Sequence, residues 1–266
     1  MSAAAPAGAA APASPFDLTG RRALVTGANT GIGRAIAVGL ADAGAHVVAV
    51  GRSSMDETLA EIEGRGGSGA AVKADLGTVA AATDAFAAAL AEHGDIDVLV
   101  NNAGIIRRSD AVDFTEADWD DVMDINLKVV FFLAQAFARH RLSRPEGEGG
   151  GSVINIASLL SFQGGIRVAS YTASKSGVAG LTKVLANEWA AKGITVNAVA
   201  PGYVETDNTQ ALRDDPERRE AILARIPMGR WAKPSDIAGA VTWLASPAAR
   251  YVTGVTVPVD GGWLAR

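Results

Sequence analysis

Residues 22–33 read Arg-Ala-Leu-Val-Thr-Gly-Ala-Asn-Thr-Gly-Ile-Gly, a short apolar run followed by a turn with three glycines. Apolar residues then recur at helical spacing from Ala35 to Leu40, so this stretch predicts a strand, a tight turn and a helix. Glycines let the main chain approach a pyrophosphate closely, and the free N–H groups of a helix N-terminus attract anions. Such turns also serve as plain helix entries, so the turn alone is weak evidence for a phosphate site.

Apolar runs and helical patterns alternate along the rest of the chain. Gly44 closes the first helix, and an apolar run at 45–50 completes a strand–helix–strand unit. Continuous apolar strands separated by helices are typical of a parallel sheet that is covered on both faces. We therefore expect α/β architecture over residues 15–266, a single domain with one doubly wound, Rossmann-type parallel sheet and helices on both faces. Further strands are expected at 70–74, 96–100, 151–157, 194–200 and 255–259, and helices at 79–92, 115–141, 171–192, 216–224 and 235–244.

Composition and charge restrict the class of function. The net charge is −5 without a basic run, which argues against nucleic-acid binding and against an anionic membrane surface. The chain has no cysteine, so disulfides, thiolate nucleophiles and cysteine metal sites are excluded, and three scattered histidines predict no metal site. A small-molecule substrate is therefore expected.

The first fourteen residues are rich in alanine, proline and glycine. They lack a positively charged start and an aliphatic core, so residues 1–14 are expected to form a disordered leader and neither a signal peptide nor a membrane span. A cytoplasmic location is the resulting expectation.

Polar or glycine-containing segments follow the ends of most predicted strands. Ligands of parallel sheets bind beyond the carboxyl ends of the strands, which all lie at one edge. This rule brings together residues 27–33, Arg52, Asp75, residues 101–104, Ser158 and Pro201-Gly202.

The end of the second strand bears on the choice of cofactor. A dinucleotide site that prefers NAD usually has Asp or Glu there, whereas an arginine accommodates a 2′-phosphate. The sequence has Arg52 and Ser53 at this point, which favours NADP. An exposed arginine without a role is equally compatible with the sequence.

Tyr171 and Lys175 lie four residues apart at the start of a predicted helix. This spacing puts both side chains on one helix face, and a neighbouring ammonium lowers the pKa of a phenol toward the range of a useful proton donor. A surface tyrosine beside a solvated lysine has the same spacing, so the pair alone does not establish an acid/base centre.

Taken in order, the motifs resemble those of the short-chain dehydrogenase/reductase family. Thr26-Gly27-x-x-x-Gly31-x-Gly33 is similar to its cofactor loop, Asn101-Asn102-Ala103-Gly104 to its sheet-stabilising motif, and Pro201-Gly202 to its nicotinamide-side turn. The resemblance implies an enzyme that transfers a hydride between NAD or NADP and a secondary alcohol or ketone. It implies that cofactor contacts come from Gly27, Asn29, Thr30, Gly31, Ile32, Gly33, Arg52, Asp75, Leu76, Asn102, Ala103, Gly104, Tyr171, Lys175, Pro201, Gly202, Val204 and Thr206.

The same resemblance implies a catalytic tetrad of Asn126, Ser158, Tyr171 and Lys175. In it Tyr171 exchanges the hydroxyl proton, and Ser158 donates a hydrogen bond to the carbonyl oxygen. Lys175 lowers the pKa of the tyrosine and contacts the nicotinamide ribose. Asn126 holds a water that links Lys175 to solvent, although an asparagine inside a helix can also bond only to backbone.

Several predicted loops are similar to a subgroup of the family that acts on 2-dehydro-3-deoxy-D-gluconate, namely residues 105–108, 161–167, 200–203, 208–210, 225–231 and 260–266. The resemblance implies a deoxy-keto-sugar acid as substrate. Its carboxylate and hydroxyls require a cation and polar donors, for which Arg107, Arg108, Gln163 and Arg167 are candidates. Each arginine is equally compatible with a solvated position. The subgroup generally favours NAD, so Arg52 is a departure from it.

Two other functions remain open, an NADPH-dependent 3-oxoacyl or general ketone reductase and a non-catalytic dinucleotide-binding sensor. The polar, turn-rich segment 203–232 is expected to form a substrate lid. The helices at 115–141 and 171–192 carry more apolar residues than one sheet-facing stripe uses, and the family resemblance implies a homotetramer through them. The excess residues include Phe131, Phe132, Phe137 and Trp189, and residues 263–266 are expected to pack across the assembly.

Overall fold

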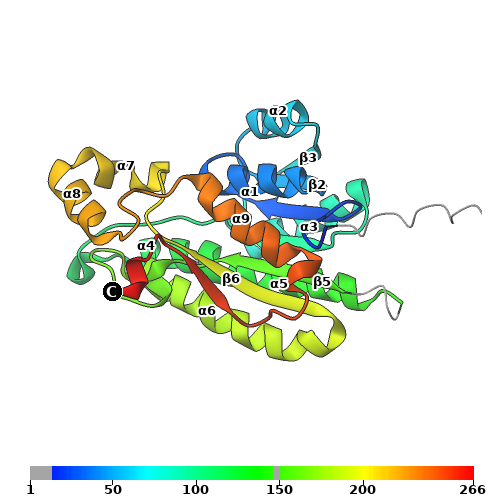
Figure 1. The fold of residues 1–266 in the computed structure, drawn as a ribbon. Coiled ribbons are helices and arrows are strands. Elements are labelled where there is room, and N and C mark those ends of the chain that lie inside the picture. The colour runs from blue at the N-terminus through cyan, green and yellow to red at the C-terminus, as the bar shows by residue number, and fades with distance from the viewer. Residues whose placement is uncertain (1–13, 146–149) are drawn as a thin grey trace, which may run out of the picture.

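The computed structural model describes residues 14–145 and 150–266. Almost all of the expected leader lies outside the described residues, as do residues 146–149. Within them the chain forms a seven-stranded sheet in the order β3-β2-β1-β4-β5-β6-β7 (Figure 1). All pairs of neighbouring strands are parallel, which confirms the predicted fold class.

The strands are β1 (Arg22–Thr26), β2 (His46–Gly51), β3 (Ser68–Lys73), β4 (Val98–Asn101), β5 (Gly151–Ile156), β6 (Ile194–Pro201) and β7 (Thr256–Val259). Because β1 pairs with β2 on one side and with β4 on the other, the direction of winding reverses at β1. Ligands of open parallel sheets bind at such a switch point. The glycine turn after β1 therefore lies where a dinucleotide is expected.

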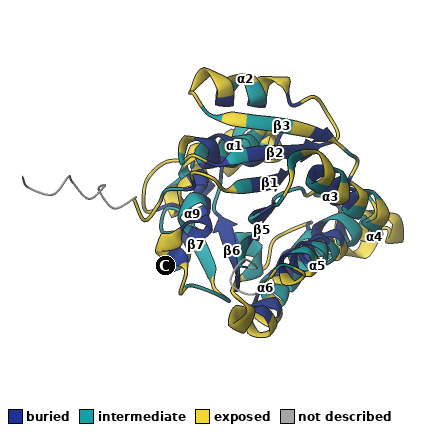
Figure 2. Ribbon diagram, turned by 90° about the vertical axis from the view of Figure 1, so that its right-hand side faces the viewer, coloured by how far each residue is buried: buried dark blue, intermediate teal, exposed yellow. Residues whose placement is uncertain are grey.

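Helices cover both faces of the sheet, with buried residues along the strands between them (Figure 2). Side chains alternate along each strand, so that Val25 points into one hydrophobic core and Leu24 into the other. The first core is shared with α1 (Gly31–Asp42), α2 (Asp56–Gly64) and α9 (Pro234–Ala245), and the second with α3 (Val79–His93), α5 (Val129–Leu142) and α6 (Ala169–Trp189).

Two of the residues that the sequence assigned to a subunit contact belong to this second core. Phe137 and Trp189 are buried among residues of the strands and of α3. Phe131 and Phe132 are only half-buried. The apolar excess on these helices is therefore smaller than the sequence indicated.

The helical pattern at 115–141 is interrupted in the structure. It consists of α4 (Glu116–Met123), a π-helical turn (Asp124–Lys128) and α5. Asn126 lies in the π-helical turn and is fully buried. Single π turns inside α-helices frequently mark functional positions.

The turn-rich segment after β6 contains two helices, α7 (Asp207–Asp214) and α8 (Pro216–Arg225). The sequence predicted a helix at 216–224, whereas α7 was not expected. Thr206 and Thr209 form a capping box at the start of α7, and the Asp215 side chain accepts hydrogen bonds from main-chain N–H groups at the start of α8. These caps satisfy N–H groups in the first turn of each helix, which have no partner within the helix.

The chain turns back on itself after β7. Gly261 and Gly262 have φ angles of 65° and 90°, and a Cβ on Gly262 would lie 2.9 Å from a carbon of Pro227. The turn brings Trp263 into a buried cluster with Leu159, Ile222, Ile226 and Trp231 of its own chain. The expectation that this end packs across an assembly therefore does not hold for Trp263. None of the helices in the described residues combines the length and the apolar character needed to cross a membrane.

Candidate active site

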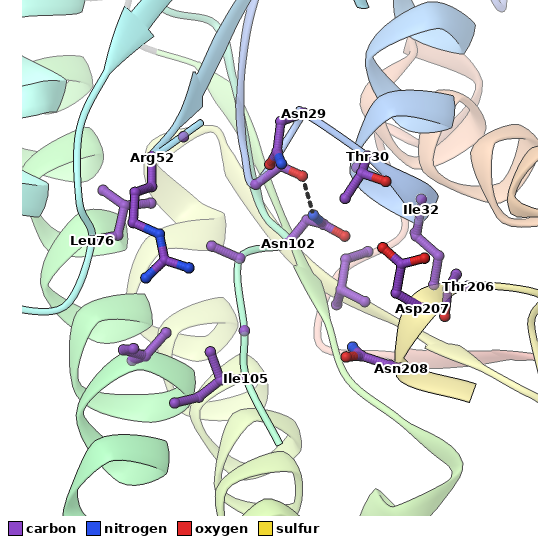
Figure 3. Close-up of a pocket in the computed structure, with 18 of the residues that line it drawn as sticks. Asn29, Thr30, Ile32, Arg52, Leu76, Asn102, Ile105, Thr206, Asp207 and Asn208 are labelled. Atoms are coloured by element: carbon purple, nitrogen blue, oxygen red, sulfur yellow. Dashed lines mark hydrogen bonds between the residues drawn. The ribbon is translucent and has the colours of Figure 1, made fainter. Parts of the chain in front are cut away.

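A cavity of about 510 Å³ lies at the carboxyl edge of the sheet (Figure 3). It brings together most of the residues that the sequence singled out, although they come from segments far apart in the chain. Those lining the cavity are Gly27, Asn29, Thr30, Gly31, Ile32, Gly33, Arg52, Asp75, Leu76, Asn102, Ala103, Gly104, Tyr171, Lys175 and Thr206.

The glycine turn between β1 and α1 has a geometry that requires glycine. Gly27 and Gly31 have φ angles of 65° and 54°, in the region that L side chains rarely adopt. A Cβ on Gly33 would lie 2.1 Å from the main-chain oxygen of Gly27. Thr30, which precedes α1, makes no side-chain capping bond, so the first-turn N–H groups of the helix are left for another acceptor. These features fit the pyrophosphate of a dinucleotide.

Thr26 joins the turn to the end of β4. Its hydroxyl accepts hydrogen bonds from the N–H groups of Asn102 and Ala103, at 2.9 and 3.0 Å, and donates to Val100. The side-chain amide of Asn102 donates to the main-chain oxygens of Thr26 and Gly27, at 2.9 and 3.2 Å. The two strand ends are thereby held at a fixed separation beneath the cavity.

Arg52 extends from the end of β2 into the cavity, beside Leu76 (Figure 3). Its guanidinium has no hydrogen-bond or ion-pair partner among the described residues, whereas most arginines of the chain are paired. A free guanidinium beside a phosphate-binding turn fits a second anionic group such as a 2′-phosphate.

Lys175 lies in the second turn of α6 and is 4% exposed. Its ammonium donates to the main-chain oxygen of Ile156 at 2.6 Å and lies 5.7 Å from the centre of the Tyr171 ring. Burial lowers the pKa of Lys175 from 10.5 to about 8. The lysine therefore changes its charge within the pH range in which enzymes operate.

Tyr171 shows the opposite shift. Burial raises the pKa of its phenol, and the hydrogen bond with Ser158 and the positive charge of Arg108 act in the lowering direction. The sequence predicted a pKa lowered by Lys175. In the structure desolvation outweighs both of these lowering effects on the pKa, and the cation responsible for one of them is Arg108. The phenol is accordingly a neutral proton donor at neutral pH.

Ser158 and Asn126 stand beside the cavity rather than in its lining. Ser158 follows β5, and its hydroxyl accepts a hydrogen bond from the N–H of Leu160 at 3.2 Å in addition to contacting Tyr171. The Asn126 amide binds both main-chain groups of Ile105, each at 2.9 Å. Asn126 thus fixes Ile105, which does line the cavity.

The predicted nicotinamide-side residues are neighbours of the cavity at the end of β6. The N–H of Gly202 donates to the oxygen of Val259 at 2.9 Å, and Val204 is buried and bridged to Ala232. Pro201 ends the strand, and none of these three residues lines the cavity itself.

The four candidate substrate residues have different surroundings. Arg107 is paired with Asp118 and Asp121 of α4, at 3.3 and 3.0 Å, and Arg167 with Asp110 at 3.2 Å. These are exposed ion pairs, which contribute little stability.

Arg108 is connected to the lid segment, and Gln163 to the turn after β7. Arg108 donates to the main-chain oxygen of Asn208 in α7 at 2.8 Å, and its charge reaches the phenol of Tyr171. Gln163 accepts a hydrogen bond from Trp263. Of the three arginines, only Arg108 is electrostatically coupled to the site.

The sequence predicted a lid at 203–232 but named only Thr206 of its residues that line the cavity. Glu205 lines it just before α7, and Asp207 and Asn208 line it from the first turn of that helix (Figure 3). Their position next to Thr206 was the available signal, but it requires the helix to be recognised. The described residues contain no group of three or more His, Cys, Asp or Glu side chains that could hold a metal ion.

Comparisons with known proteins agree with this site. A family described as enoyl-(acyl carrier protein) reductase matches residues 27–264. The 2-dehydro-3-deoxy-D-gluconate 5-dehydrogenase of Escherichia coli (strain K12) is 53% identical over 253 residues, which cover 95% of this chain and 99% of that protein. A 3-oxoacyl-[acyl-carrier-protein] reductase of Vibrio cholerae is 43% identical over 93% of this chain and 98% of its own.

A crystal structure from Agrobacterium tumefaciens, provisionally named a 2-deoxy-D-gluconate 3-dehydrogenase and holding NADP, superposes with a TM-score of 0.89. It is 62% identical and covers 95% of this chain and 99% of that one. Together with the cavity and its tyrosine and lysine, these matches confirm the resemblance found in the motifs: the chain belongs to the short-chain dehydrogenase/reductase family.

Proposed function

We propose that the protein interconverts a secondary alcohol and a ketone of a deoxy-keto-sugar acid, with 2-dehydro-3-deoxy-D-gluconate or a close relative as the substrate. One observation carries the proposal. Tyr171 and Lys175 line the same cavity as the glycine turn, in a chain that is 53% identical over 95% of its length to a relative named for this substrate.

The chain's residues fit a nicotinamide dinucleotide. The uncapped first turn of α1 would receive the pyrophosphate, and Asp75 and Leu76 the adenosine end. Arg52 would pair with a 2′-phosphate, so NADP is the favoured cofactor, and a similar structure contains it. Pro201, Gly202, Val204 and Thr206 would stand on the nicotinamide side.

In ketone reduction Tyr171 donates the proton that the product hydroxyl needs. The bound cofactor supplies the hydride and no proton, so a protein group has to provide the proton. Burial keeps the phenol protonated, and Ser158, hydrogen-bonded to it, would orient the substrate oxygen toward the phenol. In the reverse direction the phenol has to lose its proton, and the hydrogen bond with Ser158 and the positive charge of Arg108 favour that loss by lowering its pKa.

Asn126 is assigned to positioning. Both polar ends of its side chain bind the main chain of Ile105, which fixes the loop after β4 at the cavity wall. The water-holding role implied by the family resemblance stays a prediction.

Arg108 is the favoured partner for the substrate carboxylate. It is the candidate arginine whose charge acts on Tyr171, and it contacts α7 through Asn208. Residues 203–232, with α7 and α8, would form the lid over the substrate. Within this assignment residues 15–266 act as one catalytic domain.

The test is a panel of sugar acids and ketones assayed with NADP and NAD. We expect turnover of 2-dehydro-3-deoxy-D-gluconate, preferentially with NADP. Tyr171→Phe is expected to lower kcat by about 10²- to 10⁴-fold, the usual contribution of a general acid, while cofactor binding measured by fluorescence is unchanged. Undiminished turnover by this variant would remove Tyr171 from the mechanism.

A second candidate is a 3-oxoacyl or general ketone reductase. The family description and the 43% identical reductase favour it. Turnover of acyl thioesters or simple ketones, without turnover of sugar acids, would establish this function. A non-catalytic sensor has no need of Ser158, Tyr171 and Lys175 together.

The homotetramer and the cytoplasmic location stay predictions. Apolar residues available for a subunit contact on α5 and α6 include the half-buried Phe131 and Phe132, together with the exposed Leu142 and Val184. Light scattering on the purified protein measures the assembly, and a monomer would contradict the expectation.

A further inference from the structure

The indole of Trp263 is held in one orientation. The residue is 4% exposed. Its ring centre lies 4.7 Å from that of Tyr203 and 4.1 Å from the guanidinium carbon of Arg225. The Asp260 carboxylate accepts two main-chain N–H bonds of the surrounding turn, each at 2.9 Å. Close packing and a closed turn leave the ring little freedom to rotate.

The indole N–H of Trp263 donates to the side-chain oxygen of Gln163 at 3.2 Å. An indole nitrogen can only donate, whereas a glutamine amide has an accepting oxygen and an NH₂ group with two donors. The hydrogen bond therefore requires the amide oxygen of Gln163 to face Trp263. Its NH₂ group has to point the other way.

The main chain of Gln163 is fixed as well. Its N–H donates to the oxygen of Leu159 at 3.2 Å, and the Leu159 side chain packs in the same buried cluster as Trp263. Within the described part of the chain the Gln163 NH₂ group has no hydrogen-bond partner, and the side chain is half-buried. The loop that carries Gln163 begins at Ser158. An oriented and uncommitted pair of donors thus lies on the loop that leads from Ser158 to Tyr171.

This loop also adjoins the segment of Arg108. The N–H of Ser109 donates to the main-chain oxygen of Arg167 at 3.2 Å, which ties the two loops together. The donors of Gln163 and the charge of Arg108 therefore belong to neighbouring loops at one edge of the sheet.

We propose that Trp263 is a positioning residue that makes Gln163 a hydrogen-bond donor to the substrate carboxylate. The inference rests on the function proposed above, because a carboxylate only accepts hydrogen bonds and a sugar acid provides one. With its oxygen turned toward Trp263, Gln163 presents no acceptor that would repel the carboxylate.

The full-length enzyme tests the proposal through a double-mutant cycle. Trp263→Phe keeps an aromatic ring and removes the N–H, whereas Gln163→Met keeps the chain length and removes the amide. Each is expected to raise KM for 2-dehydro-3-deoxy-D-gluconate on the order of 10-fold with little change in kcat, the effect of losing a hydrogen bond to a charged group. The double variant is expected to be no worse than Gln163→Met alone, because Trp263 acts through Gln163.

Two further variants separate positioning from packing. Trp231→Phe is the matched control, since Trp231 lies in the same cluster but its buried indole nitrogen has no hydrogen-bond partner among the described residues. It is expected to leave KM unchanged. Gln163→Glu keeps an acceptor for Trp263 but presents a charge to the substrate, so its KM is expected to exceed that of Gln163→Met. The changes in KM among these variants should not be matched by parallel changes in the midpoint of thermal unfolding or in the Kd for NADP.

Additive effects in the double variant, or an unchanged KM in Trp263→Phe, would overturn the inference while leaving the proposed function intact. Wild-type enzyme that turns over a neutral ketone and no sugar acid would instead overturn the proposed function. That result would overturn this inference as well, because a neutral ketone has no carboxylate for Gln163 to bind.

Discussion

The ammonium of Lys175 donates a hydrogen bond to the main-chain oxygen of Ile156 at 2.6 Å. Ile156 is the last residue of β5, so the strand end and the helix α6 meet at this bond. One carbonyl replaces only part of the hydration that an exposed ammonium has, and burial accordingly lowers the pKa of Lys175 to about 8.

Lys175 should give the cofactor-free protein a pH-dependent stability. Its pKa is 10.5 when unfolded and about 8 when folded, so between these values the unfolded chain binds more protons and the free energy of unfolding rises with pH. Below that window the charged lysine costs about 3 kcal/mol. Lys175→Met is expected to abolish this rise, as measured by urea unfolding across the window. Identical pH dependence in both proteins would contradict the prediction.

Arg108→Leu should shift the pH dependence of catalysis. The positive charge of Arg108 lowers the pKa of Tyr171, so its removal raises that pKa further. Ketone reduction uses the neutral phenol, and the alkaline limb of kcat/KM is expected to move to higher pH. KM for the sugar acid should rise on the order of 10-fold with the loss of a carboxylate partner.

The matched control for this variant is Arg107→Leu. Arg107 is adjacent in sequence but is paired with Asp118 and Asp121 on α4. Little change in KM or in the pH profile is expected. Equal effects of the two substitutions would assign Arg108 to the surface instead of the site.

Arg52→Asp should move the cofactor preference from NADP to NAD. The substitution removes the cation placed for a 2′-phosphate and supplies a carboxylate for a ribose hydroxyl. The Kd for NADP is expected to rise by about 10- to 100-fold, the loss of a charge-assisted contact. Titration of the protein with each cofactor measures the two Kd values. Arg65→Ala is the surface control, because Arg65 is exposed and pairs with Asp42. Unaltered NADP affinity would show that Arg52 has no part in binding.

Gly33→Ala should disrupt the turn itself. The added Cβ would lie 2.1 Å from the main-chain oxygen of Gly27, which neither group can avoid without moving the turn. Loss of cofactor binding and destabilisation by several kcal/mol, on the order of 2–4, are expected for such overpacking. Thermal unfolding and cofactor titration measure both effects.

Gly239→Ala is the control for Gly33→Ala, because it makes the same substitution at a position with free space. A Cβ at this position of α9 would meet no atom within 4 Å. Alanine in a helix interior is favoured over glycine, so the free energy of unfolding should rise by about 0.5–1 kcal/mol. Destabilisation there would mean that the space around Gly239 is not open.

The sheet and the glycine turn were predictable because local patterns determine them. Uninterrupted apolar runs indicate strands that are buried on both faces of a sheet, and a glycine at position 33 indicates a close contact between main-chain segments. The helix α7 was missed because its stability comes from a cap formed by Thr206 and Thr209, in a segment with weak helix propensity.

The roles of the arginines and the pKa of the tyrosine could not be read from the sequence. Arg107 and Arg108 are adjacent in the chain, and only the fold shows that α4 supplies carboxylates to one and not to the other. The spacing of Tyr171 and Lys175 predicted that they share a helix face. The extent of burial, which raises the pKa of one and lowers the pKa of the other, depends on the packing of the whole domain.

The strand order has a consequence for how the protein is made. On one side of β1 the strands follow in the order β4, β5, β6 and β7: β4 pairs with β1, and each of the next three pairs with the strand that precedes it in the chain. The sheet can therefore extend outward in the order in which a ribosome delivers the chain. Asn102 and Ala103, which bind Thr26 beside the glycine turn, precede Tyr171 and Lys175 in the chain, so this turn can close before the helix α6 has been made.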